Sequence, residues 1–197
     1  MGDSITRGVG SSDYDPTGED IPGSGDPAQK RNIGTKSWAA KFADLVTTKY
    51  SGQCVNNGVS QYKTKDLLDN IDDLIPVNTN MVILTVGTND RNASYSTLDT
   101  NVRNLITAIK NKNIKLFVFS PIPFSGATGS LGMEKINNIF MNACKDLSVP
   151  FYSLFSEFSA FIGENNYTLS NYFEDSLHPN DAGHNLMFNI YRKSLKI

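Results

Sequence analysis

Apolar residues recur along the chain in two alternating patterns. Spacings of three and four positions, which are typical of amphipathic helices, predict helices over 37–50, 64–75, 101–111, 133–147 and 181–195. Short runs rich in β-branched and apolar residues predict strands over 53–57, 81–86, 114–119 and 149–152. Strands that alternate with helices of this length indicate βαβ units, and therefore a parallel sheet.

Local signals support this assignment. Ser37 is a residue type preferred at helix N-caps, and Pro76 ends the second predicted helix. The runs 81–86 and 114–119 are almost continuously apolar, which is the pattern of strands that are covered on both faces.

Polar or glycine-bearing segments follow the predicted strands. They are 57–60, 87–90 and 120–121, and a similar segment, 2–6, opens the chain. Sites in parallel α/β sheets form at the carboxyl ends of the strands. We therefore expect these segments to lie at one edge of the sheet and to form the functional site there.

Residues 7–36 interrupt this alternation of strands and helices. They contain six glycines and three prolines, and they show no apolar periodicity. A structureless segment of this length in a compact domain is usually functional or mobile. Because it leaves directly from 2–6, we expect this long polar loop to overhang the site and shape substrate access. A solvated insertion without substrate contact is the alternative.

Length and composition limit the classes of protein that the chain fits. Its 197 residues suit a single domain with a substantial core, and 39% of them are hydrophobic. A net charge of -2 gives no basic footprint for nucleic acid. No apolar run reaches 18 residues and no secretory leader begins at Met1, so we expect a soluble protein without a membrane span. Compartment and oligomeric state stay open.

Two cysteines, Cys54 and Cys144, lie in apolar contexts 90 positions apart. Neither has the spacing of a metal site or of a C-x-x-C redox motif. We predict two buried thiols, while a disulfide between them stays an alternative.

Three residues near the two ends of the chain have the chemistry of acyl transfer. Ser4 is a candidate nucleophile, but a serine hydroxyl needs a base to remove its proton. His178 lies in a loop just before a proline, and Asp175 precedes it by three residues. A turn between these two would let the carboxylate fix the tautomer of the imidazole. Candidate donors for the developing oxyanion are the backbone N–H groups of Ser4 and Gly58 and the side-chain amide of Asn89.

Four segments together resemble a known family. They are G-D-S-I-T (2–6), N-G-V-S (57–60), G-T-N-D (87–90) and D-S-L-H-P (175–179). Their order and spacing are similar to the four sequence blocks of the SGNH (GDSL-type) hydrolases, and the resemblance extends over nearly the whole chain. A departure is Ser176, where the family often has a glycine.

The resemblance implies a flavodoxin-like three-layer α/β/α sandwich with a central parallel sheet of about five strands. It also implies ester hydrolysis without a metal or organic cofactor. By resemblance, Ser4 is the nucleophile, His178 the base and Asp175 its partner. Ser4, Gly58 and Asn89 would form the oxyanion hole.

Other polar residues in these segments are expected to support the structure. Asp3 is predicted to brace its turn, Asp90 to hold its loop and His184 to be structural. A weaker signal, Asp13 and Asp15, matches the first half of a calcium loop, but the position of its final ligand falls on a serine instead of a glutamate. We therefore favour a solvated acidic turn over a metal site.

The long polar loop and the lack of a large apolar lid suggest a short acyl group, such as acetate on a carbohydrate. A small ester or an acetylated polysaccharide is the expected partner. A lysophospholipase or thioesterase is the alternative enzyme, and a carbohydrate-binding relative without turnover is the alternative outside enzymes.

In the family that these segments resemble, the nucleophilic serine normally follows a buried apolar strand, whereas only Met1 precedes the turn of Ser4 here. A catalytic group at a frayed terminus would be poorly ordered. We therefore expect that the polypeptide extends upstream and that the domain 1–197 lacks the start of its first strand.

Overall fold

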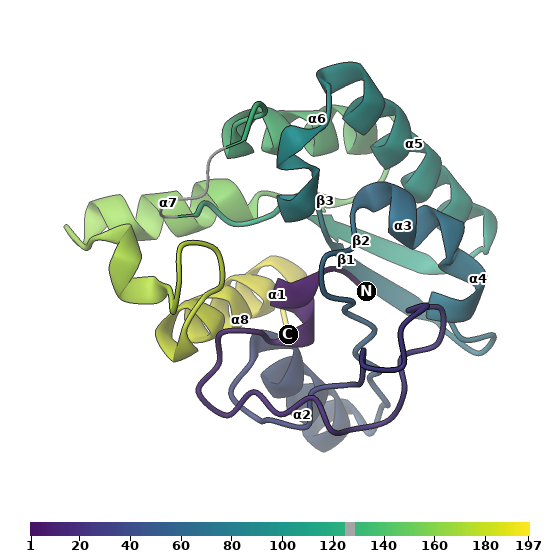
Figure 1. Cartoon of the computed structure of the whole chain (residues 1–197), viewed down its shortest axis with the longest axis horizontal. Coiled ribbons are helices and arrows are strands. Elements are labelled where there is room, and N and C mark those ends of the chain that lie inside the picture. The colour runs from purple at the N-terminus through teal and green to yellow at the C-terminus, as the bar shows by residue number, and fades with distance from the viewer. Residues whose placement is uncertain (125–128) are drawn as a thin grey trace.

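The computed structural model describes residues 1–124 and 129–197, and a parallel sheet forms its middle layer (Figure 1). The sheet has the order β1 (Met81–Thr85), β2 (Lys115–Phe119) and β3 (Phe151–Tyr152). The two longer strands pair over their full length, from Met81 opposite Lys115 to Thr85 opposite Phe119. The three corresponding strand predictions are confirmed, with ends shifted by one or two residues.

Two further segments continue the sheet on the outer side of β1, but only through single bridges. Gly2 forms parallel bridges with Thr85 on one side and with Gly58 on the other. Residues 53–57 form no strand, so that prediction is wrong. The α/β class with a parallel sheet is confirmed, while the expected five strands are three strands and two bridged segments.

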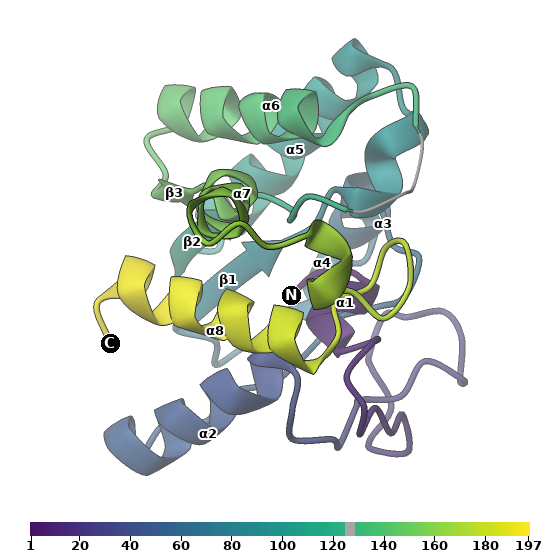
Figure 2. The same ribbon diagram turned by 90° about the vertical axis from the view of Figure 1, so that its left-hand side faces the viewer.

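Helices cover both faces of the sheet, as Figures 1 and 2 show. On one face lie α3 (Thr64–Asp69), α5 (Tyr95–Asn111) and α6 (Met133–Asp146). The other face carries α2 (Trp38–Tyr50), α7 (Leu154–Glu164) and α8 (Asp181–Leu195). Across the described ranges, none of the helices has both the length and the apolar character needed to cross a bilayer.

Each face of the sheet has its own core. Leu84 and Val118 are fully buried against the side of α3, α5 and α6. On the opposite side, the ring of Tyr191 stacks on that of Trp38 with 4.2 Å between centroids, and Phe119 completes this aromatic group. Successive strand residues point to opposite faces of the sheet, and both faces are buried. This explains why the strand sequences are almost continuously apolar.

The helix boundaries differ from the prediction at several places. The helix expected over 64–75 is broken at Asn70, whose side-chain amide donates to the carbonyl of Asp66, and a short α4 (Ile71–Leu74) follows. The helix α5 begins six residues earlier than expected, after an N-cap at Ser94. The helix α7 was not predicted, although Leu154 and Phe158 have helical spacing after an N-cap serine. The N-cap role of Ser37 is confirmed, because its side chain accepts from the N–H of Ala40.

The two cysteines have different environments, and both are free thiols. Cys144 is fully buried in α6, as predicted, and burial raises its pKa to about 12. Cys54 is exposed, so the prediction that it is buried is wrong. That prediction depended on the apolar sequence context of Cys54, whereas residues 53–57 form no strand that would bury it in the sheet.

His184, in the first turn of α8, is fully buried and structural, as expected. Its Nε2–H donates to the carbonyl of Val9 at 3.2 Å, and its Nδ1 lies 3.5 Å from the N–H of Trp38. Burial lowers the pKa of His184 to about 4. The neutral ring therefore ties the start of the long polar loop to α2 and α8.

We predict that His184→Gln changes how stability depends on pH. Unfolded histidine binds a proton near pH 6.5, whereas folded His184 does so only near pH 4. The wild-type protein therefore loses stability as the pH falls from 6.5 to 4, by about 1 kcal/mol for each pH unit. The variant lacks this loss, so the gap in unfolding free energy between the two proteins should narrow toward pH 4.5.

Urea unfolding at pH 7.5, 6.0 and 4.5 measures this gap. Asp3, whose raised pKa acts in the opposite direction, is present in both proteins and cancels in the difference. A gap that stays constant with pH would contradict a buried neutral ring.

Candidate active site

Ser4 is the first residue of α1 (Ser4–Arg7), a single helical turn that directly follows the bridge at Gly2. The side chain of Asp3 caps this turn by accepting from the N–H of Ile5 at 3.0 Å, which is the bracing role expected for it. A Cβ at position 2 would lie 2.1 Å from the carbonyl oxygen of Thr85. Only glycine therefore allows the nucleophile turn to lie this close to β1.

Hydrogen bonds connect Ser4, His178 and Asp175, although the first two are 174 positions apart. Ser4 Oγ lies 3.0 Å from His178 Nε2, and His178 Nδ1 lies 2.8 Å from Asp175 Oδ2. With the Nδ1 proton shared with the carboxylate, Nε2 is free to accept the proton of the serine. Figures 1 and 2 both show the loop before α8 beside α1, which is where these side chains meet.

The loop that carries His178 is itself held by hydrogen bonds to Asp175. Asp175 Oδ1 accepts from the N–H groups of Leu177 and His178, both at 2.6 Å. Partial burial acts to raise the pKa of Asp175, but these hydrogen bonds and the one from the His178 ring outweigh it and lower the pKa. One side chain thus keeps its negative charge, shapes the turn and orients the imidazole.

Asp3 differs from Asp175, because its carboxyl group is almost completely buried. This burial raises the pKa of Asp3 to about 6, while its hydrogen bond from Ile5 and the nearby His178 ring act in the opposite direction. The pKa of Asp3, next to Ser4, is therefore raised, whereas the pKa of Asp175, next to the His178 ring, is lowered.

Two of the three expected oxyanion donors are available. The N–H of Ser4 has no protein acceptor in the parts of the chain that the structure describes. Asn89 lies in η1 (Thr88–Asn92), just beyond the end of β1, and one hydrogen of its amide is donated to the carbonyl of Tyr62 at 3.0 Å. This bond orients the side chain and leaves its second hydrogen for a ligand.

Gly58, the third expected donor, departs from this expectation. Its N–H already donates to Asn56 Oδ1 at 3.0 Å. A Cβ at this position would lie 2.3 Å from the backbone nitrogen of Arg7, so the close packing against α1 explains the glycine. The geometry assigns Gly58 a packing role beneath the nucleophile turn.

Two residues next to these segments were missed by sequence reasoning. Gln61 has left-handed backbone with φ of 69°, and no glycine or asparagine marks it. Arg7 is buried and donates to the carbonyls of Ala28 and Lys30 and to the side chain of Ser60. Nothing in the local sequence distinguishes this arginine from a surface residue.

The long polar loop contacts the segments that carry the triad. Gly10 lies against the backbone of Pro179 and the Cβ of His178, and Ser12 donates twice to Asp181 at 2.8 Å. Farther along, the carbonyl of Gly23 accepts from the hydroxyl of Tyr62 at 2.7 Å. The loop therefore borders both the base and the segment that orients the Asn89 amide.

The acidic turn at Asp13 and Asp15 is held by hydrogen bonds to residues 32–36. The carboxylate of Asp13 accepts from both the N–H and the hydroxyl of Thr35, and from the N–H of Lys36. Among the described residues no three His, Cys, Asp or Glu side chains are grouped so that they could hold a metal ion.

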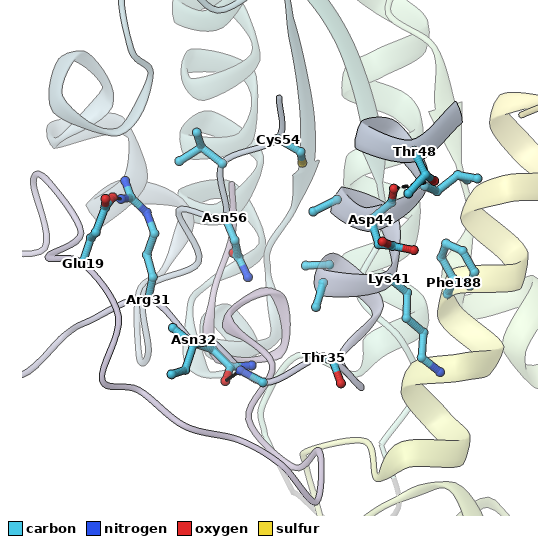
Figure 3. Close-up of a pocket in the computed structure, with 17 residues that line it drawn as sticks. Glu19, Arg31, Asn32, Thr35, Lys41, Asp44, Thr48, Cys54, Asn56 and Phe188 are labelled. Atoms are coloured by element: carbon cyan, nitrogen blue, oxygen red, sulfur yellow. Dashed lines mark hydrogen bonds and ion pairs between the residues drawn. The ribbon is translucent and has the colours of Figure 1, made fainter. Parts of the chain in front are cut away.

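Two cavities share the segment 54–56 as a common wall, and neither is lined by a triad residue. The larger, of about 680 Å³, is shown in Figure 3. Arg31, paired with Glu19, lies at one side of it, and Lys41, Asp44 and Thr48 of α2 lie at the other. The second cavity, of about 540 Å³, lies between this segment and β1.

Comparisons with solved structures show the same fold in other proteins. The acetylxylan esterase Axe2 from Geobacillus stearothermophilus matches with a TM-score of 0.76 and 18% identity, over 100% of this chain and 92% of that one. A protein from Lactobacillus plantarum matches with a TM-score of 0.71 and 16% identity, over 100% and 94% of the two chains. At this identity the likeness concerns the fold.

A search of curated proteins finds no match to the sequence. The sequence model of the GDSL-like lipase/acylhydrolase family, in contrast, matches residues 1–186, which include every segment of the site. Together with the fold and the meeting of Ser4, His178 and Asp175, this match shows that the chain belongs to the GDSL-like lipase/acylhydrolase family.

Proposed function

We propose that the protein is a serine ester hydrolase that works through an acyl-enzyme. The observation that carries this proposal is the hydrogen-bonded series from Ser4 Oγ through the His178 ring to Asp175. A serine becomes a useful nucleophile when a base can take its proton and a third group fixes the tautomer of that base. Membership of the family is in accord with this chemistry.

The positions of Ser4, His178 and Asp175 support a reaction in two steps. His178 Nε2 takes the proton of Ser4 Oγ, which attacks the ester carbonyl carbon. The N–H of Ser4 and the free amide hydrogen of Asn89 stabilise the negative oxygen of the tetrahedral intermediate. The protonated ring then donates to the leaving alcohol, and a water molecule that His178 deprotonates releases the acid.

For the substrate we propose short acyl esters, such as O-acetyl groups on carbohydrate. The loop that borders the base is polar, and its contacts there are made by Gly10 and Ser12. Neither of the two cavities is lined by a triad residue, so neither provides a tunnel for a long acyl chain that starts at Ser4. A protein of the same fold is called an acetylxylan esterase.

Two alternative functions would require different properties of the same site. A lysophospholipase or thioesterase needs room for an extended acyl chain. A carbohydrate-binding relative without turnover needs no reactive serine, although the bond between Ser4 and His178 is of the length that proton transfer requires.

Replacement of the nucleophile tests the reaction class. We predict that Ser4→Ala lowers the turnover of p-nitrophenyl acetate by more than about 10⁴-fold, because no other group can form the acyl-enzyme. A fluorophosphonate probe should label the wild-type protein at Ser4 and leave the variant unlabelled. Ser96→Ala, a change on the exposed side of α5, is the matched control. Unlabelled wild-type protein would favour the binding relative.

Replacement of the acid tests how the base is oriented. In Asp175→Asn the remaining carbonyl oxygen can keep the two backbone donors of the turn, while the new NH₂ group faces His178 Nδ1. The ring then favours the tautomer with the proton on Nε2, which cannot accept from Ser4. We expect kcat to fall by about 10³- to 10⁴-fold with little change in KM.

Glu174→Gln removes the same charge from the neighbouring exposed residue and serves as the control. An equal loss of kcat in both variants would mean that Asp175 contributes its charge and does not orient the His178 ring.

A chain-length series tests the acyl specificity. We predict that kcat/KM falls by at least about tenfold between p-nitrophenyl acetate and the octanoate, since neither of the two cavities described above is lined by Ser4. Release of acetate from acetylated xylan, measured beside this series, separates carbohydrate esters from simple ones. A maximum at octanoate would favour the lipid-ester alternative.

A further inference from the structure

Three aromatic rings gather at the C-terminal end of α7. Phe161 lies in the helix, and Tyr167 and Tyr172 follow it along the chain. The centroid of the Tyr167 ring lies 5.9 Å from that of Phe161 and 5.9 Å from that of Tyr172, and the centroids of the Phe161 and Tyr172 rings are 5.8 Å apart. Tyr167 is 47% exposed and Tyr172 is partly exposed. The three rings therefore form one aromatic surface that solvent reaches, which we call the tyrosine surface.

Backbone hydrogen bonds hold these rings in place. The N–H of Tyr167 donates to the carbonyl of Ile162 at 3.0 Å, which closes the end of α7. Tyr172 ends η2 (Leu169–Tyr172), and its carbonyl accepts from the N–H of Asn180 at 3.0 Å. Because the surface is fixed before any partner arrives, binding to it costs less conformational entropy than the ordering of a flexible loop would cost.

The tyrosine surface is joined to the loop that carries His178. Asn180 comes two residues after His178, and Phe173 forms an antiparallel bridge with Pro179. In Figure 1 the end of α7 and the turn after it project past the carboxyl ends of β1 and β2, beside the loop before α8, and Figure 2 shows the same two segments side by side. The surface therefore flanks the edge of the sheet at which Ser4 and His178 meet.

The residues around these rings are polar but uncharged. Residues 165–173 contain no charged side chain, and neither lysine nor arginine occurs between positions 146 and 191. Nucleic acids and anionic lipid surfaces need cations from a protein, and this segment does not provide them. A sugar ring matches the segment better, because its C–H groups pack on the face of an aromatic ring while its hydroxyls bond to exposed polar groups such as those of Asn166, Thr168 and Ser170.

We propose that the tyrosine surface binds a sugar unit of the carbohydrate chain whose acetyl ester is cleaved at Ser4. This inference rests on the proposed function and adds to it a second point of attachment, away from the reacting atoms. Contacts with a remote part of the substrate that are equal in the ground state and in the transition state lower KM and leave kcat unchanged. The surface should therefore matter for an ester on a long carbohydrate chain and not for a small ester.

The test compares a carbohydrate ester with a small one. KM is measured for acetylated xylan and for p-nitrophenyl acetate in the wild-type protein and in Tyr167→Ala, Tyr167→Phe and Tyr95→Ala. The phenylalanine variant keeps the ring, and Tyr95, which is 51% exposed at the start of α5, is the matched control. We expect the ratio of the KM for xylan to the KM for the small ester to rise by about three- to tenfold in Tyr167→Ala alone.

A binding measurement makes the result independent of turnover. Titration of an unacetylated xylooligosaccharide should give a Kd that is about three- to tenfold higher for Tyr167→Ala than for the wild-type protein. A wild-type protein that does not hydrolyse p-nitrophenyl acetate would contradict the proposed function, whereas this titration would still test the tyrosine surface.

The proposal would be overturned by an unchanged KM ratio in Tyr167→Ala, by an equal rise of the ratio in Tyr167→Phe or Tyr95→Ala, or by a wild-type protein that does not bind the xylooligosaccharide. A rise in KM that is larger for p-nitrophenyl octanoate than for acetylated xylan would also overturn it, because the surface would then bind acyl chains. A lower mass of Tyr167→Ala in light scattering would show instead that the surface contacts a second copy of the chain.

Discussion

The position of Ser4 depends on the backbone contact between Gly2 and β1. This contact places the first turn of the chain against the carbonyl of Thr85 and, on its other side, against Gly58. Because α1 has only four residues, it has little stability of its own, and its place comes from these bridges and from the Asp3 cap. His178 lies in a separate loop, so a shift of the turn would break the hydrogen bond between Ser4 and His178.

The sequence was sufficient to predict those elements in which the local pattern of apolar residues agrees with the tertiary packing. The helices α2, α6 and α8 have an apolar stripe, and their limits match the prediction closely. Of the polar segments predicted at one edge of the sheet, 2–6 is bridged to Gly58 and to Thr85, which lies just before 87–90, as the topology of a parallel sheet favours. Ser4, His178 and Asp175 could be chosen on residue type and order alone.

The failures have a different physical origin, because each depends on a partner that the local sequence does not contain. Residues 53–57 have a strand pattern, but a strand needs neighbours, and the space next to them is a cavity. The buried position of Arg7 and the left-handed backbone of Gln61 follow from the course of the long polar loop and its neighbours, which no periodicity encodes.

The wide separation of nucleophile and base along the chain has a consequence for folding. Asp175 and His178 lie within one turn, so their contact is local, whereas the bond from His178 to Ser4 joins residues that are 174 positions apart. Contacts of such long range form late, after the intervening elements have packed. Catalytic activity should therefore recover only with the last step of refolding, after helical signal has returned, and it can serve as a reporter of complete chain closure.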